Sequence, residues 1–248
     1  MSNTVIIIPS RLKAKRLPDK PLKLINGKEM IIHVHDVAKK SGAGEVLVAT
    51  ADKEIDRLVK KNNGMSFLSL KQHETGSDRV YEAFNNFFSS KPEVIINLQG
   101  DMPNLKPETL MELRDYMLKG KCDIATLASS IKDNYEIDNE NIVKVTVKDD
   151  IKKTRFSHAN DFNRKLINSK KQFIYHHIGI YAFTKEALLR YVNLERSKLE
   201  IERNLEQMRA MENKMEIHVG YTSSNPLSVD TPEDLEKVRN EMEKNEKN

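Results

Sequence analysis

Short apolar runs alternate with segments of helical spacing along the first half of this 248-residue chain. Continuous runs rich in Val and Ile are typical of strands buried on both faces, and apolar residues three and four apart are typical of helices. The pattern predicts strands at 5–8, 45–50, 65–70 and 94–98, separated by helices at 30–40, 52–62 and 79–88. This order predicts an α/β protein with a doubly wound sheet.

The second half of the chain predicts a mixed set of elements. A helix at 108–119 precedes strands at 123–130 and 173–183, and between these strands a hairpin pairs 142–147 with 151–157. The pattern then predicts a helix that starts at Thr184 and runs through 191, a helix at 199–211, a strand at 216–220 and a C-terminal helix.

Polar residues at the expected helix starts predict N-caps, because short side chains can accept from the free N–H groups there. The candidates are Asp52, Ser77 or Asp78, Thr184, and Thr231 followed by Pro232 and a capping-box Asp234.

The loop after the first strand is strongly cationic. Asp19 is its only acid, and its basic residues are Arg11, Lys13, Lys15, Arg16, Lys20 and Lys23. Ligands of open α/β sheets bind at the carboxyl ends of strands, and clustered charges attract counter-ions. The chain has neither a G-x-x-x-x-G-K loop nor a G-x-G-x-x-G fingerprint after this strand. An anion-binding loop and a solvated basic loop are both compatible with this pattern.

Two acids lie where a metal–phosphate site could be built. Asp101 follows the buried strand at 94–98 and a glycine, although an Asp in a turn is the simpler interpretation. Asp230 stands just before the C-terminal helix, and the capping pattern there does not explain it.

Two further patterns leave alternatives open. His176 and His177 are adjacent in a strand, so they face opposite ways and cannot bind one metal together. Each is either a structural histidine or a substrate hydrogen-bonding group. The loop at 71–79 is either a helix start with its cap or a loop that contacts a nucleotide.

Composition narrows the classes of function. Charged residues make up 31% of the chain, and the net charge of +4 is too small to indicate nucleic-acid binding. Cys122 is the single cysteine, so no disulfide can form within the chain, which fits a reducing compartment. The sequence shows no signal-peptide pattern and no apolar run of membrane-spanning length, so we expect a cytoplasmic protein.

Ten segments in order along nearly the whole chain resemble one known family. They are Ile7–Arg11, Arg16–Pro21, Ile25–Lys28, His73–Arg79, Asn97–Pro103, Val143–Val145, Phe156–Ser157, His177–Tyr181, Leu205–Arg209 and Val229–Leu235. This pattern resembles the 3-deoxy-manno-octulosonate cytidylyltransferases, or CMP-KDO synthetases. The resemblance implies a single domain over 1–248 with a three-layer, mostly parallel mixed sheet of the nucleotide-diphospho-sugar transferase type. It also implies a hairpin region at about 142–183 for dimerisation and sugar binding.

The resemblance further implies an activity. Such an enzyme transfers CMP from CTP to the anomeric hydroxyl of 3-deoxy-D-manno-octulosonate (KDO), with Mg²⁺, and releases pyrophosphate. The product serves lipopolysaccharide synthesis, and the enzyme is a cytoplasmic homodimer that binds neither nucleic acid nor membrane. The alternatives are a cytidylyltransferase for 8-amino-KDO or a sialic-type acid, and a non-catalytic nucleotide-binding protein.

The resemblance assigns roles to individual residues. The catalytic residues are Lys20, Arg11 and Asp101. Nucleotide binding falls to Arg11, Arg16, Lys20, Ser77, Arg79 and Gln99. Sugar binding falls to Gln99, His177, Tyr181, Glu206 and Gln207. Asp101 and Asp230 are the Mg²⁺ ligands. The sequence departs from the family pattern at Lys15, Met102 and His158.

Overall fold

The computed structural model describes residues 3–71, 73, 75–89, 92–165 and 173–246. The chain forms two compact units, which are described separately below: a first unit of residues 1–114 and 226–248, and a second unit of residues 115–225. This division concerns compactness only, so the single cytidylyltransferase domain predicted over 1–248 stays a prediction.

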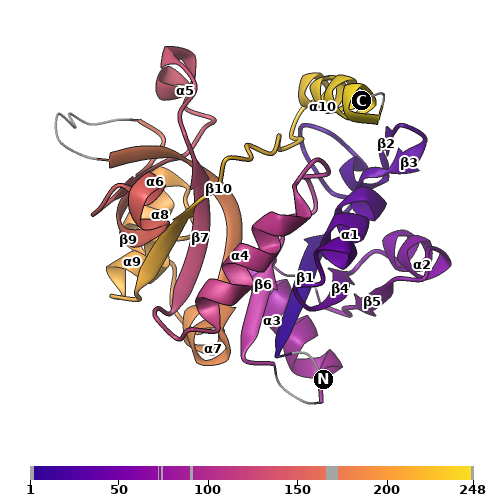
Figure 1. Ribbon diagram of the computed structural model, residues 1–248. Coiled ribbons are helices and arrows are strands. Elements are labelled where there is room, and N and C mark those ends of the chain that lie inside the picture. Colours follow the sequence, from indigo (N-terminus) through magenta and orange to yellow (C-terminus); the bar gives the residue numbers. More distant parts are fainter. Residues whose placement is uncertain (1–2, 72, 74, 90–91, 166–172, 247–248) are drawn as a thin grey trace. The chain divides into compact units, whose positions relative to one another are not determined.

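Four parallel strands form the sheet of the first unit (Figure 1). In spatial order they are β5 (Met65–Leu68), β4 (Glu45–Thr50), β1 (Thr4–Ser10) and β6 (Val94–Asn97). The helices of this unit are η1 (Lys20–Leu22), α1 (Met30–Ser41), α2 (Lys53–Lys61), α3 (Gly76–Phe87) and α10 (Pro232–Glu246). Helix α4 (Pro107–Met117) begins in the first unit and ends in the second.

The apolar run at the start of the chain forms the buried centre of this sheet, as predicted. Val5, Ile6, Ile7 and Ile8 are all fully buried in β1. Ile7 of β1 lies opposite Asn97, the last residue of β6, in a parallel register. The cationic loop after β1 and the segment that leads to Asp101 therefore leave the sheet at the same edge.

A tight hairpin joins the cationic loop to α1. Its strands are β2 (Leu24–Ile25) and β3 (Lys28–Glu29), and the turn residues Asn26 and Gly27 have φ angles of 48° and 78°. Both angles are left-handed, as a two-residue type I′ turn requires, and Asn-Gly is the sequence that favours it.

Five strands form the mixed sheet of the second unit. In spatial order they are β10 (Phe173–Thr184), β7 (Ile124–Ser129), β11 (Ile217–Tyr221), β9 (Phe156–Asn163) and β8 (Lys144–Val147). Only the β7–β11 pair is parallel among these described strands, and β8 also pairs with the first residues of β10. The five strands therefore close on themselves.

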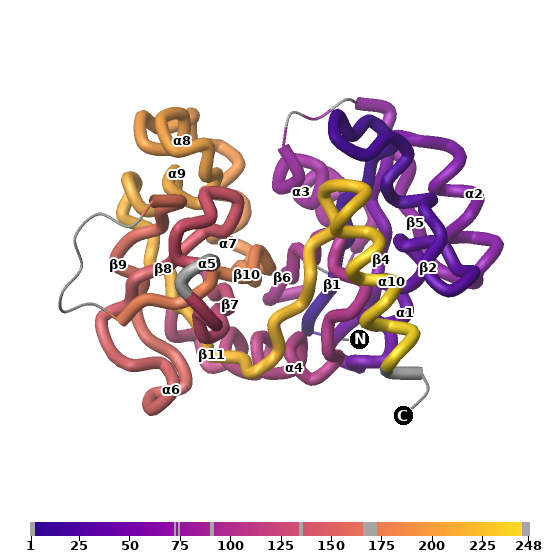
Figure 2. The backbone as a smooth tube through the Cα atoms, turned by 90° about the horizontal axis from the view of Figure 1, so that it is seen from above, coloured from indigo at the N-terminus to yellow at the C-terminus, as the bar shows by residue number. Residues whose placement is uncertain are grey.

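Five short helices accompany that sheet within the described part of the second unit. They are α5 (Asn134–Asp138), α6 (Ile151–Thr154), α7 (Lys185–Val192), α8 (Lys198–Arg203) and α9 (Met208–Glu212). Thr184 caps α7 as predicted, because its hydroxyl accepts from the N–H of Ala187. Helices α8 and α9 lie together within the second unit (Figure 2).

Two predicted elements of this unit are wrong. Residues 151–154 form helix α6 rather than the start of a hairpin strand, because Asp150 caps them by accepting from the N–H of Lys152. The pairing strand β9 begins at Phe156. The helix predicted at 199–211 is two helices, because Asn204 adopts a left-handed φ of 51° after α8. Residues 166–172 of the predicted 142–183 region lie outside the described residues.

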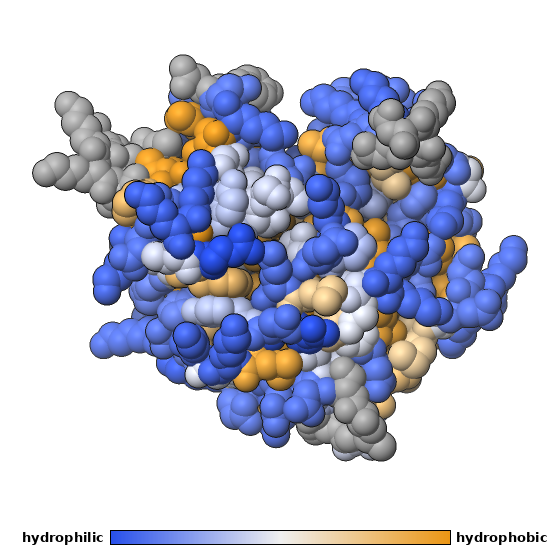
Figure 3. All heavy atoms as spheres, viewed as in Figure 1, coloured by the Kyte–Doolittle hydropathy of each residue, from blue (hydrophilic) through white to orange (hydrophobic). Residues whose placement is uncertain are grey.

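The α/β class with mixed strand directions is confirmed, whereas the three-layer, doubly wound organisation stays a prediction. Hydrophilic side chains cover most of the face shown in Figure 3, and apolar side chains form small separate groups. Within the described ranges, every helix is too short or too polar to span a lipid bilayer.

Candidate active site

Lys20 lies between the two acids that the sequence singled out. Its Nζ donates to Asp101 Oδ2 at 2.8 Å and to Asp230 Oδ1 at 3.2 Å. Arg16 contacts the other oxygen of Asp230 at 3.0 Å. The side chains of Lys20 and Asp101 are 17% and 19% exposed, so their contact is shielded from water. Residues from three distant segments of the first unit therefore meet at one point.

The charge of Lys20 is set by its surroundings. Burial alone would lower the pKa of its ammonium group, but the carboxylates of Asp101 and Asp230 outweigh this effect and raise the pKa above its ordinary value. Lys20 is therefore a positive charge at neutral pH.

Backbone contacts hold the cationic loop in place. The N–H of Asp19 donates to the carbonyl of Leu12, and the N–H of Leu12 donates to Asp52 Oδ2 at 2.9 Å. Asp52 stands at the N-terminus of α2 as predicted, but its side chain makes no capping bond there. The prediction of a side-chain cap was wrong because the loop after β1 takes this carboxylate.

An apolar cluster anchors the same loop to the C-terminal helix. Leu17, from the middle of the loop, is buried in this cluster. The other buried members are Ile25, Met30, Val229, Leu235 and Val238. Because Leu17 lies between Arg16 and Lys20 in sequence, its burial limits where those two cations can lie.

The backbone positions Asp230 beside Asp101. The N–H of Val229 donates to the carbonyl of Asp101 at 3.0 Å. Asp234 accepts from the N–H groups of Asp230 and Thr231, while the hydroxyl of Thr231 accepts from the N–H of Asp234. The predicted capping box is therefore confirmed, and its carboxylate also holds the backbone of Asp230.

The donor atoms fit a magnesium ion. Asp101 Oδ1 is buried and has no hydrogen-bond partner within the part of the chain that the structure describes. Mg²⁺ prefers carboxylate oxygens and commonly uses one or two of them together with water and substrate phosphates. Two acids suffice for such a site, and no larger group of metal-binding side chains occurs among the described residues.

Two further residues that were predicted to bind the nucleotide, Arg79 and Gln99, lie near the ends of β1 and β6. Arg79 is buried and donates to the carbonyl of Ser10 at 2.6 Å. Burial, and then the nearby charge of Arg11, lower the pKa of Arg79. Gln99 donates to the side chain of Asn97 at 3.2 Å.

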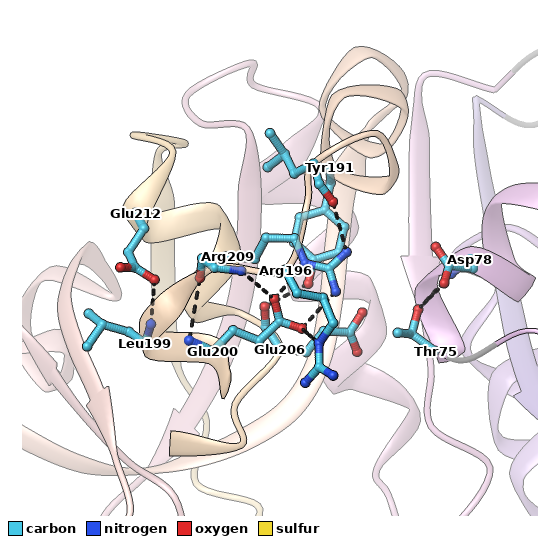
Figure 4. Close-up of polar contacts among 11 residues, drawn as sticks. Thr75, Asp78, Tyr191, Arg196, Leu199, Glu200, Glu206, Arg209 and Glu212 are labelled. Carbon is cyan, nitrogen blue, oxygen red and sulfur yellow. Dashed lines mark hydrogen bonds and ion pairs between the residues drawn. The ribbon is translucent and has the colours of Figure 1, made fainter. Parts of the chain in front are cut away.

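The cap of α3 differs from the prediction. Thr75, rather than Ser77 or Asp78, is the N-cap, and its hydroxyl accepts from the N–H of Asp78. It also donates to the carboxylate of Asp78 (Figure 4). Ser77 is buried in the first turn of α3. The helix was predicted at 79–88, but it begins at Gly76, and for this reason its N-cap is Thr75.

Four of the predicted sugar-binding residues lie in the second unit. His177 is on β10, next to a register shift between Ile178 and Tyr181. The hydroxyl of Thr126 donates to the carbonyl of Ile180 at 2.7 Å, so it accepts from His177 Nε2 at 3.0 Å. Sequence reasoning missed Thr126, because its role depends on the strand pairing.

The imidazole of His177 is neutral. Burial, and then the neighbouring His176, lower the pKa of His177 to about 3. With its Nε2 proton donated to Thr126, the ring presents Nδ1 as a hydrogen-bond acceptor. The Tyr181 ring lies 5.6 Å away, and burial, followed by Glu206, raises the pKa of its hydroxyl.

The segment with Glu206 and Gln207 joins α8 to α9. Tyr191 donates to the carbonyl of Glu206 at 2.9 Å, and Gln207 is buried at the start of α9. The two helices are also linked by the N–H of Leu199, which donates to the Glu212 carboxylate (Figure 4).

A buried ion pair fixes the same two helices. Arg209 donates through Nε and Nη2 to both oxygens of Glu200, at 2.8 and 2.7 Å (Figure 4). Arg196 and the N–H of Ser197 also donate to this carboxylate. Arg209 is the last residue of the family segment Leu205–Arg209, and this was its only signal in the sequence. The sequence did not indicate that Arg209 pairs with Glu200.

Two departures from the family pattern can now be located. Met102 is buried after β6. His158 is exposed on β9 opposite His218, and the two ring centres are 6.0 Å apart.

The predicted site residues fall into two groups. The first unit carries Arg11, Arg16, Lys20, Ser77, Arg79, Gln99, Asp101 and Asp230. The second unit carries His177, Tyr181, Glu206 and Gln207.

Comparisons with known proteins identify the family of the chain. A cytidylyltransferase family model matches residues 5–217. The 3-deoxy-manno-octulosonate cytidylyltransferase of Bartonella henselae is 39% identical over 236 residues, covering 95% of this chain and 96% of that protein. Its counterpart in Paramagnetospirillum magneticum is 38% identical over 237 residues, with the same shares covered.

A solved structure agrees with these relatives. CMP:2-keto-3-deoxy-manno-octonic acid synthetase complexed with CTP is 33% identical, with a TM-score of 0.89 over 98% of this chain and 100% of that one. The chain therefore belongs to the cytidylyltransferase family. Its relatives there are the 3-deoxy-manno-octulosonate cytidylyltransferases, so the resemblance found in the sequence and the nucleotidyltransferase class are both confirmed.

Proposed function

We propose that this chain transfers CMP from CTP to the anomeric hydroxyl of KDO, giving CMP-KDO and pyrophosphate for lipopolysaccharide synthesis. The observation that carries the proposal is the meeting of Lys20 with Asp101 and Asp230 in a member of this family. Pure anion binding gains nothing from carboxylates beside phosphate groups, whereas metal-assisted transfer requires them.

The cations of the first unit bind the triphosphate. Arg11, Arg16 and Lys20 hold the phosphates and the departing pyrophosphate, because guanidinium groups can fork onto phosphate oxygens and ammonium acts as a point charge. Ser77, Arg79 and Gln99 contact the nucleotide. The burial of Arg79 and its bond to the carbonyl of Ser10 support a preorganised position.

Asp101 and Asp230 would hold the magnesium ion. When bound, it would supply positive charge to the α-phosphate. The buried Asp101 Oδ1 supports this assignment, since it has no hydrogen-bond partner among the described residues. With a metal bound, the two acids would supply a cation to the reacting phosphate.

Sugar-acid binding is assigned to His177, Tyr181, Glu206 and Gln207 in the second unit, and Gln99 of the first unit stays a predicted sugar contact. The neutral ring of His177 supports a role as acceptor for a sugar hydroxyl, since burial keeps its pKa near 3. The Glu200–Arg209 pair supports the segment that carries Glu206 and Gln207, because it ties α8 to α9.

The proposal extends to the assembly. We expect a cytoplasmic homodimer built through the 142–183 region, with a three-layer, doubly wound sheet of the nucleotide-diphospho-sugar transferase type. Light scattering on the purified protein tests the dimer, and a monomeric mass would exclude it.

Pyrophosphate release from CTP and Mg²⁺ with a panel of sugar acids tests the function directly. We expect release with KDO and much slower release with 8-amino-KDO or a sialic acid. Faster release with 8-amino-KDO or with a sialic acid would show that this sugar acid, rather than KDO, is the substrate. CTP binding without release for any sugar acid would favour a non-catalytic nucleotide-binding protein.

A further inference from the structure

A single ammonium group lies where the two proposed metal ligands converge. Lys20 Nζ contacts one oxygen of Asp101 and one of Asp230, at 2.8 and 3.2 Å. We propose that Lys20 holds the place of the metal ion in the nucleotide-free protein and must leave it before a divalent cation can bind both acids. This inference rests on the proposed function, which supplies the metal and the triphosphate.

The distances favour an exchange of one cation for the other. Magnesium binds oxygen at about 2.1 Å, so a cation at the Nζ position needs each carboxylate to move by only about 1 Å. The ammonium and the metal use the same oxygens of Asp101 and Asp230, and therefore they cannot occupy this position together. Asp101 Oδ1 offers a further oxygen, because in the described part of the chain it has no partner.

The balance of charge favours the same exchange. Two carboxylates face two cations, since Arg16 contacts Asp230 at 3.0 Å in addition to Lys20. If Lys20 stayed in place, a divalent metal ion would add positive charge that no carboxylate of this cluster is left to balance. Replacement of the Lys20 ammonium avoids that cost and frees the ammonium for another anion.

The triphosphate is the anion best suited to receive Lys20. The cationic loop that carries Lys20 is the proposed phosphate-binding loop, so the freed ammonium stays close to the phosphates. CTP draws Lys20 away from the two acids, as metal binding requires. The metal releases Lys20 toward the phosphates, as CTP binding requires. Metal and CTP should therefore bind with positive coupling, part of which passes through Lys20.

Titration with Mn²⁺ in the absence of nucleotide tests the exchange. Free Mn²⁺ is measured by electron paramagnetic resonance in wild-type protein and in Lys20→Met. We expect the variant to bind Mn²⁺ at least about tenfold more tightly, a typical size for such coupling. The factor by which CTP tightens Mn²⁺ binding should also be smaller in the variant.

Two matched variants separate the contact from general charge effects. Lys23→Met removes one positive charge from the same loop and should bind Mn²⁺ like the wild type. Lys20→Arg keeps the charge between the acids and should also bind Mn²⁺ weakly without nucleotide. Equal tightening in Lys20→Met and Lys23→Met would show that net charge alone is responsible, and would overturn the proposal.

Thermal unfolding provides a second readout and reveals a variant that folds poorly. Mn²⁺ alone should raise the melting temperature of Lys20→Met more than that of the wild type, because a tighter ligand stabilises the folded state more. Unchanged or weaker Mn²⁺ binding in folded Lys20→Met would make Lys20 a fixed part of the site. None of these readouts uses a sugar or turnover, so failure of the exchange and failure of the proposed function remain distinguishable.

Discussion

The contact of Lys20 with Asp101 and Asp230 in the first unit and the Glu200–Arg209 pair in the second unit are built in opposite ways. In the second unit, Glu200 and Arg209 are nine residues apart in the sequence and lie on neighbouring helices. In the first unit, Lys20 is 81 residues from Asp101 and 210 residues from Asp230. Glu200 receives donors from Arg209, Arg196 and Ser197, whereas Asp101 keeps a buried oxygen that has no partner in the described part.

This difference is the one expected between a structural ion pair and the proposed metal site. Glu200 and Arg209 are both buried and bidentate, so their charges are satisfied by the protein itself. Asp230 is 43% exposed, and the two acids share one ammonium. The charges of the first arrangement are paired within the protein, whereas the second keeps the oxygen that the proposed metal site requires.

The largest effect on stability should come from breaking the Glu200–Arg209 pair. Arg209→Met leaves Glu200 buried without its main partner, and we expect a loss of about 3–5 kcal/mol in the free energy of unfolding. Urea denaturation measures it. Arg196→Met is the matched control, because Arg196 contacts the same carboxylate from an exposed position and should cost less than about 1 kcal/mol. Equal losses in the two variants would show that Arg209 is no more important to Glu200 than the exposed Arg196.

The next largest effect should appear in catalysis rather than in stability. Asp101→Asn and Asp230→Asn should each lower turnover at least about 100-fold, the scale of losing one preorganised charge stabiliser. Pyrophosphate release from CTP measures the loss. Lys20 keeps one acidic partner in either variant, so the unfolding free energy should change less than in Arg209→Met. Full activity in either variant would show that the replaced acid is not a ligand of the proposed metal ion.

A smaller effect should follow from removing the cap of α10. Thr231→Ala deletes the hydroxyl that accepts from the N–H of Asp234, at a cost of about 1 kcal/mol in stability. Thermal unfolding measures this cost. Thr184→Ala, which removes the equivalent cap of α7, is the matched control for stability. Only Thr231→Ala should also weaken Mn²⁺ binding in the presence of CTP, since it adjoins Asp230.

The smallest effect should be the acid dependence of the satisfied pair. Burial opposes ionisation of Glu200, but its bonds to Arg209 outweigh burial and lower its pKa. The stabilisation is therefore complete above the ordinary carboxyl pKa and is lost as pH falls through the lowered value. The stability difference between wild type and Glu200→Gln should shrink as pH is lowered from about 6 to about 3. A constant difference over this range would argue against a lowered pKa.

Local patterns predicted the features that depend on local chemistry. The buried strand β1 followed from its β-branched run, and the cap at Thr231 followed from Thr-Pro-Glu-Asp. Helix α6 and the break at Asn204 were missed, because each depends on one capping or left-handed residue inside a longer pattern. Asn tolerates the left-handed region, so Asn204 was the available signal.

The site required information that local patterns do not contain. Asp101 and Asp230 were singled out by position and resemblance, but the presence of Lys20 between them depends on how three distant segments pack. Likewise, Asp52 was predicted as a cap and instead holds the cationic loop. Both residues had a plausible local role, and tertiary contacts decided between the possibilities.

The burial of Leu17 against the C-terminal helix has a practical consequence for anyone who handles this protein. Leu235 and Val238 of α10 pack in the same cluster as Leu17. Truncation, proteolytic clipping or a bulky fusion at that helix would loosen the loop of Arg16 and Lys20 without altering any residue that is proposed to contact CTP. An affinity tag is therefore better placed at the N-terminus, and preparations that have lost tail residues should be assayed for nucleotide binding before use.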